Sequence, residues 1–312
     1  MGIMTKQTSI QSKVRFTGKG LHCGRIVHLD VLPAKADTGI VFHRNDDPAA
    51  EPIQAHAFNI TSTALSTTIG LGPSSVSTIE HLMAAFAGLG ISNAIVRLNA
   101  PEVPIMDGSS KPFVKKLMTA GIRELDKAQK IWKVIKPFEI REGDQFIRIE
   151  PSRRQRYQCS IDFPFHMIGK QSVDYWASTE NFIRVANART FCHIKDVNMM
   201  KEQGLALGGS LENAIVISDD GLLNAEGLRS QEEFAEHKLL DLIGDMALLG
   251  APFLGDVKVH KPGHALTAKF TKALLENESE YLEAMFISPF VRPKEHVSTA
   301  SQVFRPAWAN LG

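Results

Sequence analysis

The chain has 312 residues, which at about 150 residues per domain favours two domains and excludes a mini-protein held together by disulfides. Its 35 lysine and arginine residues against 34 acidic residues leave a net charge of +1, so we expect no nucleic-acid partner. The most apolar stretch without Asp, Glu, Lys or Arg, residues 82–96, is shorter than the roughly 20 apolar residues that cross a bilayer, so we expect no transmembrane segment.

The first part of the chain changes from strand to helix patterning. Apolar and polar residues alternate over 14–16 and 27–31, which predicts antiparallel strands. Helical spacing over 82–89 follows Thr78, which we expect to cap that helix, and a strand is expected at 94–98. The elements expected after it are a helix from about residue 110, strands at 132–135, 138–140, 146–149 and up to about 163, a helix at 182–188, a strand at 214–217, a helix at 231–249, a strand at 257–260 and a helix at 266–275.

The order of elements indicates two related halves joined by a polar stretch at 126–130. Glu80-His81, seven residues before Gly88, matches Glu236-His237, seven residues before Gly244. Clustered strands and helices within each half predict an α+β fold. The expected domains are a first α+β domain over 1–126, a second over 127–295 with an inserted segment at about 188–215, and a tail over 296–312 to which we assign no role.

The helix expected at 231–249 carries two potential metal ligands. His237 and Asp241 are four residues apart, so they stand about 40° apart on one face and are able to reach the same ion. Lys238 and Asp245 fall beside them, while leucines and alanines form a separate apolar stripe. A face with these charges is either exposed to solvent or lines a site.

A second histidine favours a site. His81 follows Glu80 at the start of an otherwise apolar helix. Burial of these two polar residues with the helix costs free energy unless they bind a partner. His81, His237 and Asp241 together form a three-ligand set for one Zn²⁺, with the fourth position left for water. Glu80, next to a ligand, is then expected to act as general base. Three protein ligands indicate a catalytic metal rather than a structural one.

His264 lies in a Lys-Pro-Gly-His-Ala turn that opens the last helix. Its position suits a general acid that protonates a leaving group. Because the positive end of the helix dipole disfavours an imidazolium there, an acidic partner is needed, and Asp245 is the one we expect. A purely structural turn histidine is the alternative.

The segment after residue 188 combines polar and flexible apolar residues. Met199, Met200 and several leucines suit either a passage for an alkyl group or an ordinary core under a loop. Gly18-Lys19-Gly20 lacks the spacing of a nucleotide-binding loop, so a mononucleotide fold is not supported.

The three cysteines, Cys23, Cys159 and Cys192, form no CxxC pair and cannot all pair with one another. Together with an N-terminus that has neither a signal core nor an amphipathic presequence, they predict a cytoplasmic protein, which we expect to be a monomer.

Ten short runs spread in order along the chain resemble the zinc-dependent UDP-3-O-acyl-N-acetylglucosamine deacetylases of lipid A biosynthesis. A His-x-x-x-Asp motif alone is weak, whereas ten runs together are specific. They are GLHCG at 20–24, GIVF at 39–42, STT at 66–68, IEHL at 79–82, EVPIMDGS at 102–109, ARTF at 188–191, LGGS at 207–210, LLN at 222–224, HKLLD at 237–241 and GHAL at 263–266.

The resemblance implies a two-domain sandwich with helices packed between two sheets, a site where the domains meet, and hydrolysis of an acetamide at the committed step of lipid A formation. It implies one Zn²⁺ per chain, or Fe²⁺ in its place, on His81, His237 and Asp241. It also implies the remaining roles: Glu80 as base, His264 as acid oriented by Asp245, Thr190 at the oxyanion, Leu21 and Phe191 at the sugar and acyl chain, Lys238 and Lys261 at the glucosamine and diphosphate, and Phe163 at the uracil.

The chain departs from the family pattern near the expected acyl passage, where Cys192-His193 replaces a glycine and an aromatic residue. Cys23 replaces a serine, and His260 replaces an aromatic residue. Two other functions remain open: a zinc amidohydrolase that needs neither nucleotide nor acyl chain, and a binding protein for a nucleotide sugar or lipid with structural zinc. Glu80 and His264 argue against the binding protein, which needs neither residue.

Overall fold

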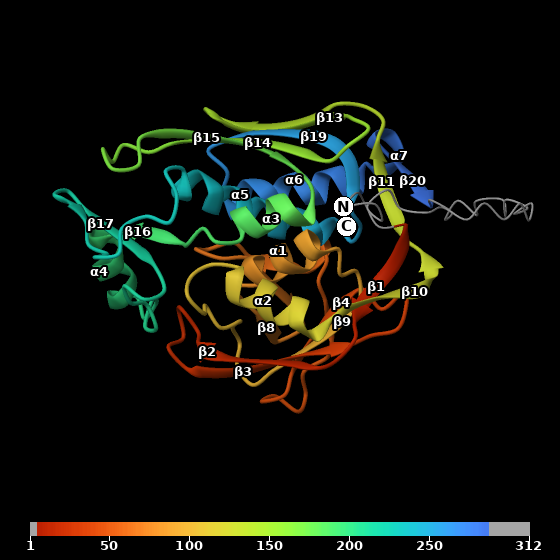
Figure 1. The fold of residues 1–312 in the computed structure, drawn as a ribbon, viewed down its shortest axis with the longest axis horizontal. Helices are drawn as coiled ribbons and strands as arrows, with labels where there is room; N and C mark the ends of the chain where they lie inside the picture. The colour runs from red at the N-terminus through yellow and green to blue at the C-terminus, as the bar shows by residue number, and fades with distance from the viewer. Residues whose placement is uncertain (1–4, 287–312) are drawn as a thin grey trace, which may run out of the picture.

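The molecule has two β-sheets as outer layers with its main helices between them (Figure 1). The computed structural model describes residues 5–286. Strands and helices thus form layers within each half, and the predicted α+β fold is confirmed. The tail expected at 296–312 lies outside the described residues.

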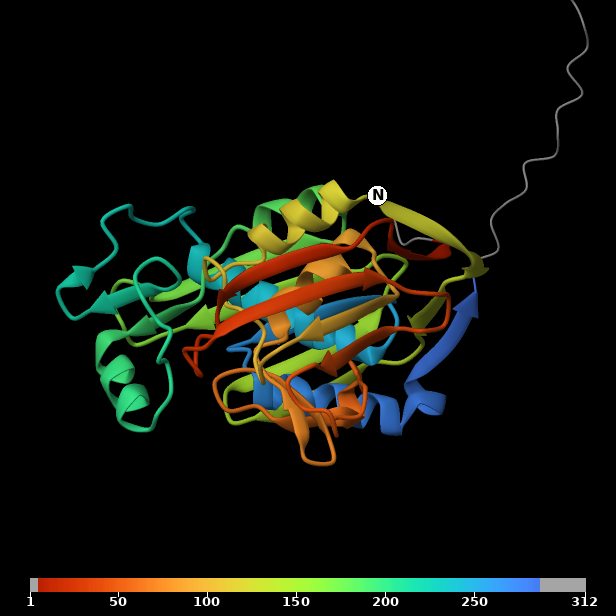
Figure 2. The same ribbon diagram turned by 90° about the horizontal axis from the view of Figure 1, so that it is seen from below.

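The first half supplies one outer sheet, whose strands lie across the face seen in Figure 2. Its elements are β1 (Lys6–Ile10), β2 (Val14–Lys19), β3 (Ile26–Pro33), β4 (Ile40–Arg44), β5 (Ile53–Gln54), η1 (Ala57–Asn59), β6 (Ile60–Ser62), β7 (Thr68–Leu71), β8 (Ser74–Val76), α1 (Glu80–Leu89), β9 (Ala94–Leu98), α2 (Lys111–Ala120) and β10 (Ile122–Ala128). Five strands pair in the order β2-β3-β9-β4-β5, and β6, β7 and β8 form a smaller sheet. Val27, Leu29 and Val31 of β3 are buried while their neighbours are more exposed, as the alternation predicted.

The second half supplies the other outer sheet. Its elements are β11 (Lys130–Val134), β12 (Phe138–Glu142), β13 (Gln145–Pro151), β14 (Arg156–Asp162), β15 (Lys170–Trp176), α3 (Thr179–Val185), β16 (Phe191–His193), α4 (Ile194–Glu202), β17 (Ile215–Ser218), β18 (Gly221–Leu222), α5 (Glu233–Met246), η2 (Ala247–Leu249), β19 (Phe253–His260), α6 (His264–Glu276), α7 (Glu278–Tyr281) and β20 (Leu282–Phe286). The sheet runs β12-β13-β19-β11-β20, and β14 pairs with β19 and β15.

The structure differs from two expectations, the helix cap at Thr78 and the polar stretch between the two halves. Thr78 does not cap α1: it has a φ of 57°, its hydroxyl donates to Glu102, and Ile79 precedes the helix without a side-chain cap. The polar stretch that we expected at 126–130 is largely strand, because β10 continues to Ala128 and pairs with β1. A domain boundary near residue 127 stays a prediction.

Helix α5 is buried on nearly all sides, which rules out a solvent-exposed face for His237 and Asp241. It crosses α1 closely at Gly244, where a Cβ atom would collide with the carbonyl oxygen of Glu80. The glycine therefore lets the two helices touch. This crossing brings the beginning of α1, which carries Glu80 and His81, against the middle of α5.

One hydrophobic core joins the two halves, since buried side chains from α1, α5 and both large sheets form a single cluster. Among residues 5–286, no helix combines the length and the apolar character that crossing a bilayer requires.

Candidate metal centre

Three side chains from α1 and α5 converge on one point. Ligand atoms of His81, His237 and Asp241 all lie within 4.8 Å of one another, and all three residues are buried. Asp241 Oδ1 is 3.4 Å from His81 Nε2 and 3.3 Å from His237 Nε2. Two imidazoles and one carboxylate in this arrangement suit a tetrahedral zinc ion with one open position.

The contacts around the ligands orient them toward a shared ion. His237 Nδ1 donates to the carbonyl oxygen of Ala188 at 3.1 Å, which turns Nε2 toward Asp241. Asp241 Oδ2 accepts from Lys238 Nζ at 3.0 Å, whereas its Oδ1 is buried and has no hydrogen-bond partner in the described chain. A buried carboxylate oxygen without a donor is costly, and a cation at this point would satisfy it.

The protonation states favour metal binding. Burial lowers the pKa of His237 to about 3, so its imidazole is neutral at pH 7, which is the form that binds zinc. Burial alone would raise the pKa of Asp241, but the neighbouring His237 and Lys238 hold it well below its usual range. The carboxylate is therefore ionised and available as a ligand.

Glu80 lies beside the ligand set in a dry environment. It is 3% exposed, and burial raises its pKa above the usual range. Its Oε2 accepts the backbone N–H of Thr67 at 3.0 Å, and its Oε1 receives no hydrogen bond from residues 5–286. A carboxylate with one anchored oxygen, one free oxygen and a raised pKa suits a general base.

His264 and Asp245 form the second titratable pair of the site. His264 Nδ1 lies 2.8 Å from Asp245 Oδ2, as the sequence predicted. Burial alone would lower the pKa of His264, but the Asp245 carboxylate raises it to about 9. Lys238, Asp241, Asp245 and His264 line a hollow of about 10 Å³, which holds about one water molecule.

Aromatic residues form the wall next to the ligands. The Phe191 ring lies 6.2 Å from the His237 ring and 5.5 Å from the Phe163 ring. Lys238 Nζ stands 5.7 Å from the centre of the Phe191 ring. Three of the residues expected to contact substrate are thus grouped beside the metal site.

Leu21, Thr190 and Lys261, the other residues expected at the substrate, form no hydrogen bond or ion pair with the three ligands within the described part of the chain. The carbonyl oxygen of Leu21 accepts the N–H of Gly208, so the loop at 20–24 borders the segment at 188–215. Thr190 is tied by its backbone to Gly108 and Ile215. Lys261 has its ammonium group 2.5 Å from Asp144 and 3.7 Å from Asp162.

Two features of the site were missed from the sequence. Thr67 links Glu80 to the Asp245–His264 pair, because it donates hydrogen bonds to both Glu80 and Asp245. Arg189 is a buried cation that binds Glu233, in the first turn of α5, at 2.9 Å. Arg189 separates Ala188, which accepts from His237, from Thr190. Both residues fall inside runs that resemble the family, STT and ARTF, and that was the one signal for them.

Comparison with known proteins identifies the family of this chain. Residues 7–276 match the model of the UDP-3-O-acyl N-acetylglycosamine deacetylase (LpxC) family. A UDP-3-O-acyl-N-acetylglucosamine deacetylase from Citrifermentans bemidjiense is 47% identical over 92% of this chain and 96% of that protein. Proteins of the same name are 45% identical in Campylobacter fetus, over 88% of this chain and 94% of theirs, and 45% identical in Acidithiobacillus ferrooxidans, over 87% and 90%.

Proposed function

The chain belongs to the UDP-3-O-acyl-N-acetylglucosamine deacetylase family, and from that membership we propose that it removes the N-acetyl group from UDP-3-O-acyl-N-acetylglucosamine in lipid A biosynthesis. The products are UDP-3-O-acyl-glucosamine and acetate. The convergence of His81, His237 and Asp241 beside Glu80 is the observation that carries the proposal, because it supplies a metal site and a base at one point.

His81, His237 and Asp241 would hold one zinc ion, and the same donors accept Fe²⁺. When bound, the ion would act as a Lewis acid that polarises the acetamide carbonyl, and it would lower the pKa of a water molecule bound to it to about 7. The buried Asp241 Oδ1, which lacks a hydrogen-bond donor within the described chain, supports a cation at this position. Lys238 holds the other Asp241 oxygen, so the carboxylate presents Oδ1 to the ligand set.

Glu80 takes the proton of the attacking water. Burial raises the pKa of Glu80 toward neutral pH, which makes its carboxylate a stronger base. The Thr67 amide holds Oε2 in place while Oε1 accepts the proton. Burial keeps bulk water from competing for the carboxylate.

His264 donates a proton to the departing amine. Asp245 binds Nδ1 and keeps the ring protonated, so Nε2 is the atom that delivers the proton. Thr190 is assigned to the developing oxyanion. Its backbone is held between Gly108 and Ile215, which limits where its hydroxyl group moves.

Substrate recognition extends from this centre along the inserted segment. Phe191 and Leu21 contact the sugar and acyl chain, Lys238 and Lys261 contact the glucosamine and diphosphate, and Phe163 contacts the uracil. The edge-to-face contacts of Phe191 with Phe163 and His237, together with Lys238 near the Phe191 ring, support the first part of this path. Lys261 would exchange its bonds to Asp144 and Asp162 for a phosphate.

The three cysteines are unpaired, which supports a reducing cytoplasmic compartment. Action as a monomer stays a prediction.

Acetate release from UDP-3-O-acyl-N-acetylglucosamine tests the proposal. Purified protein should release acetate, lose this activity on chelation and recover it with one equivalent of zinc. Equal activity on a simple sugar amide would favour a general zinc amidohydrolase. No release by folded protein that contains zinc would replace the deacetylase with a binding protein.

A further inference from the structure

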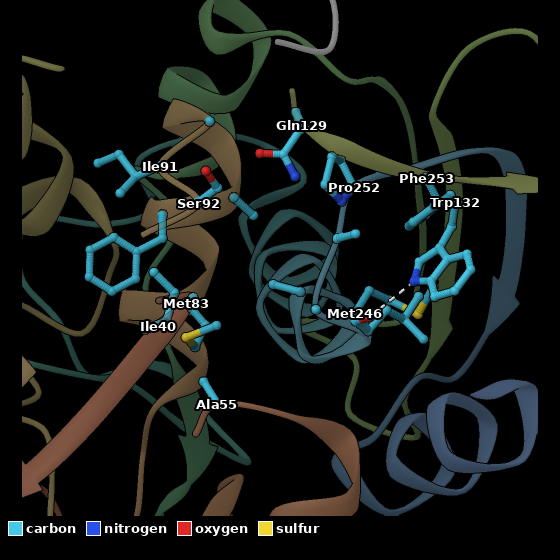
Figure 3. A pocket seen from close by; sticks show the side chains of 18 of the residues that line it. Ile40, Ala55, Met83, Ile91, Ser92, Gln129, Trp132, Met246, Pro252 and Phe253 are labelled. Atoms are coloured by element: carbon cyan, nitrogen blue, oxygen red, sulfur yellow. Dashed lines mark hydrogen bonds between the residues drawn. The ribbon is translucent and has the colours of Figure 1, made fainter. Parts of the chain in front are cut away.

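A large cavity lies between the two halves of the molecule, away from the metal centre. Its volume is about 670 Å³, within the range of about 300–1,000 Å³ found for small-molecule sites. Figure 3 shows Ile40, Ala55 and Met83 of the first half on one side of it. Met246 and Trp132 of the second half lie on the other side.

The cavity and the metal centre use different faces of the same helix. His237 and Met246 are nine residues apart on α5, which places them about 180° apart around the helix axis. Ile243 and Met246 line the cavity, whereas Asp241 and Asp245 line the small hollow at His264. The cavity is therefore separate from the proposed active site, and a ligand bound in it is independent of the proposed function.

The inner lining suits a flexible apolar chain. Met83 and Met246 contribute unbranched side chains that adapt to irregular ligand shapes. Phe86, Trp132 and Phe253 add aromatic surface, and each of the five is at least 95% buried. An alkyl chain that enters between these side chains would be removed from water.

The cavity also carries a cation that lacks a carboxylate partner among residues 5–286. Lys130 lines it with its Nζ 3.5 Å from the centre of the Trp132 ring. Burial lowers the pKa of Lys130, and the charge of Glu278, which also lines the cavity, only partly opposes this. The third charged lining residue, Asp37, is already paired with Lys127. An anion bound at Lys130 would therefore gain a partly desolvated charge partner.

We propose that this cavity binds a single-chain fatty-acid carboxylate, with the alkyl chain between Met83 and Met246 and the carboxylate at Lys130. The ligand spans both halves, so it fills space that the two sheets and α1 and α5 leave open. Binding is non-covalent and needs no group from the metal centre. Because an acyl chain is also expected near Phe191, the test must report on the cavity alone.

Trp132 provides such a local probe. Phe substitutions at Trp176 and at Trp308, which lies outside the described residues, leave Trp132 as the single tryptophan of the chain. Titration with 2-bromododecanoate, which carries its bromine next to the carboxylate, should then quench its fluorescence saturably below the micelle concentration, because bromine quenches only at short range and Lys130 Nζ lies 3.5 Å from the centre of the Trp132 ring. Ligand bound near Phe191 leaves the signal unchanged, since β16 and β11 lie at opposite ends of the molecule in Figure 1.

Three variants of the single-tryptophan protein test where the carboxylate and the alkyl chain of the ligand bind. Lys130→Gln should weaken binding of the carboxylate about tenfold and leave its neutral methyl ester unaffected. Lys133→Gln is the matched control, since this lysine lies on the same strand but pairs with Glu283. Ala87→Phe adds bulk to the lining and should abolish quenching by both ligands.

Unsaturable quenching, or equal effects of the Lys130 and Lys133 variants, would overturn the proposal. Circular dichroism checks that the Ala87 variant is folded. If the Ala87 variant is not folded, the affinities of the Lys130→Gln variant for the carboxylate and for the methyl ester still test the proposal.

Discussion

The hydroxyl group of Thr67 donates a hydrogen bond to Asp245 Oδ1 at 2.6 Å, although the two residues are 178 positions apart. The backbone N–H of Thr67 also donates to Glu80 at 3.0 Å, and its hydroxyl oxygen lies 3.2 Å from His264 Nδ1. One residue thus links the proposed base to the proposed acid and its orienting carboxylate. We conclude that Thr67 positions both groups.

Thr67→Val should lower kcat about ten- to a hundredfold, because it removes a buried hydrogen bond to a carboxylate, worth about 1.5–3 kcal/mol. The backbone bond to Glu80 remains, so zinc content should stay at one per chain. Thr67→Ser keeps the hydroxyl group and should retain most activity. Steady-state kinetics with metal analysis decide, and equal losses in the two variants would contradict the role of the hydroxyl.

Glu80→Gln should reduce kcat by about 10²–10⁴-fold while zinc content is unchanged, because the amide cannot accept the proton. Glu236→Gln is the control, since Glu236 holds the equivalent place beside His237 in the internal sequence match but binds Ser230 instead of the site. Near-full activity of the Glu80 variant would remove the base assignment.

Asp241→Asn should weaken zinc binding by more than about 100-fold. Loss of a residue that only hydrogen-bonds to a metal ligand already lowers metal affinity by about 10- to 100-fold, and Asp241 is expected to be a ligand itself. Competition with a chromogenic chelator measures this directly. Asp256→Asn, at a half-buried aspartate that binds Arg156 away from the metal centre, should leave zinc affinity unchanged. Unaltered zinc affinity in Asp241→Asn would exclude Asp241 as a ligand.

His264 should titrate near pH 9 in the metal-free protein, as measured by NMR. A folded-state pKa above the usual 6.5 means that protonation stabilises the fold. This contribution is fully present below about pH 6.5 and is lost as the pH rises through about 9. Asp245→Asn should lower the pKa of His264 and flatten the pH dependence of the melting temperature. A pKa near 6.5 in the unsubstituted metal-free protein would contradict the ion pair.

Arg189→Met should destabilise the protein by about 3–5 kcal/mol, because it leaves Glu233 buried without its partner. Arg189→Met with Glu233→Leu should recover much of the stability but not kcat, since the segment that holds Ala188 and Thr190 is no longer tied to α5. Arg184→Met is the exposed control. Chemical unfolding and kinetics separate the effects, and full recovery of kcat in the double variant would make the pair purely structural.

The local patterns that predicted most elements depend on short-range physical chemistry. The strand at 94–98 was predicted with its observed ends, and helix α6 was predicted as 266–275 against His264–Glu276. Alternation and helical spacing record which face of an element is buried. The cap at Thr78 failed because its hydroxyl binds Glu102, a residue 24 positions away that no local pattern reveals.

By itself, the sequence determined the α+β class and the family, and it predicted the set of His81, His237, Asp241, Glu80 and His264, because four-residue spacing and specific runs are local properties. The tertiary structure alone decided that α1 meets α5 at Gly244, that Thr67 joins Glu80 to Asp245, and that a cavity opens behind the metal centre. These features arise where residues far apart in the chain pack together. Their geometry depends on the whole core, and no short segment of sequence encodes it.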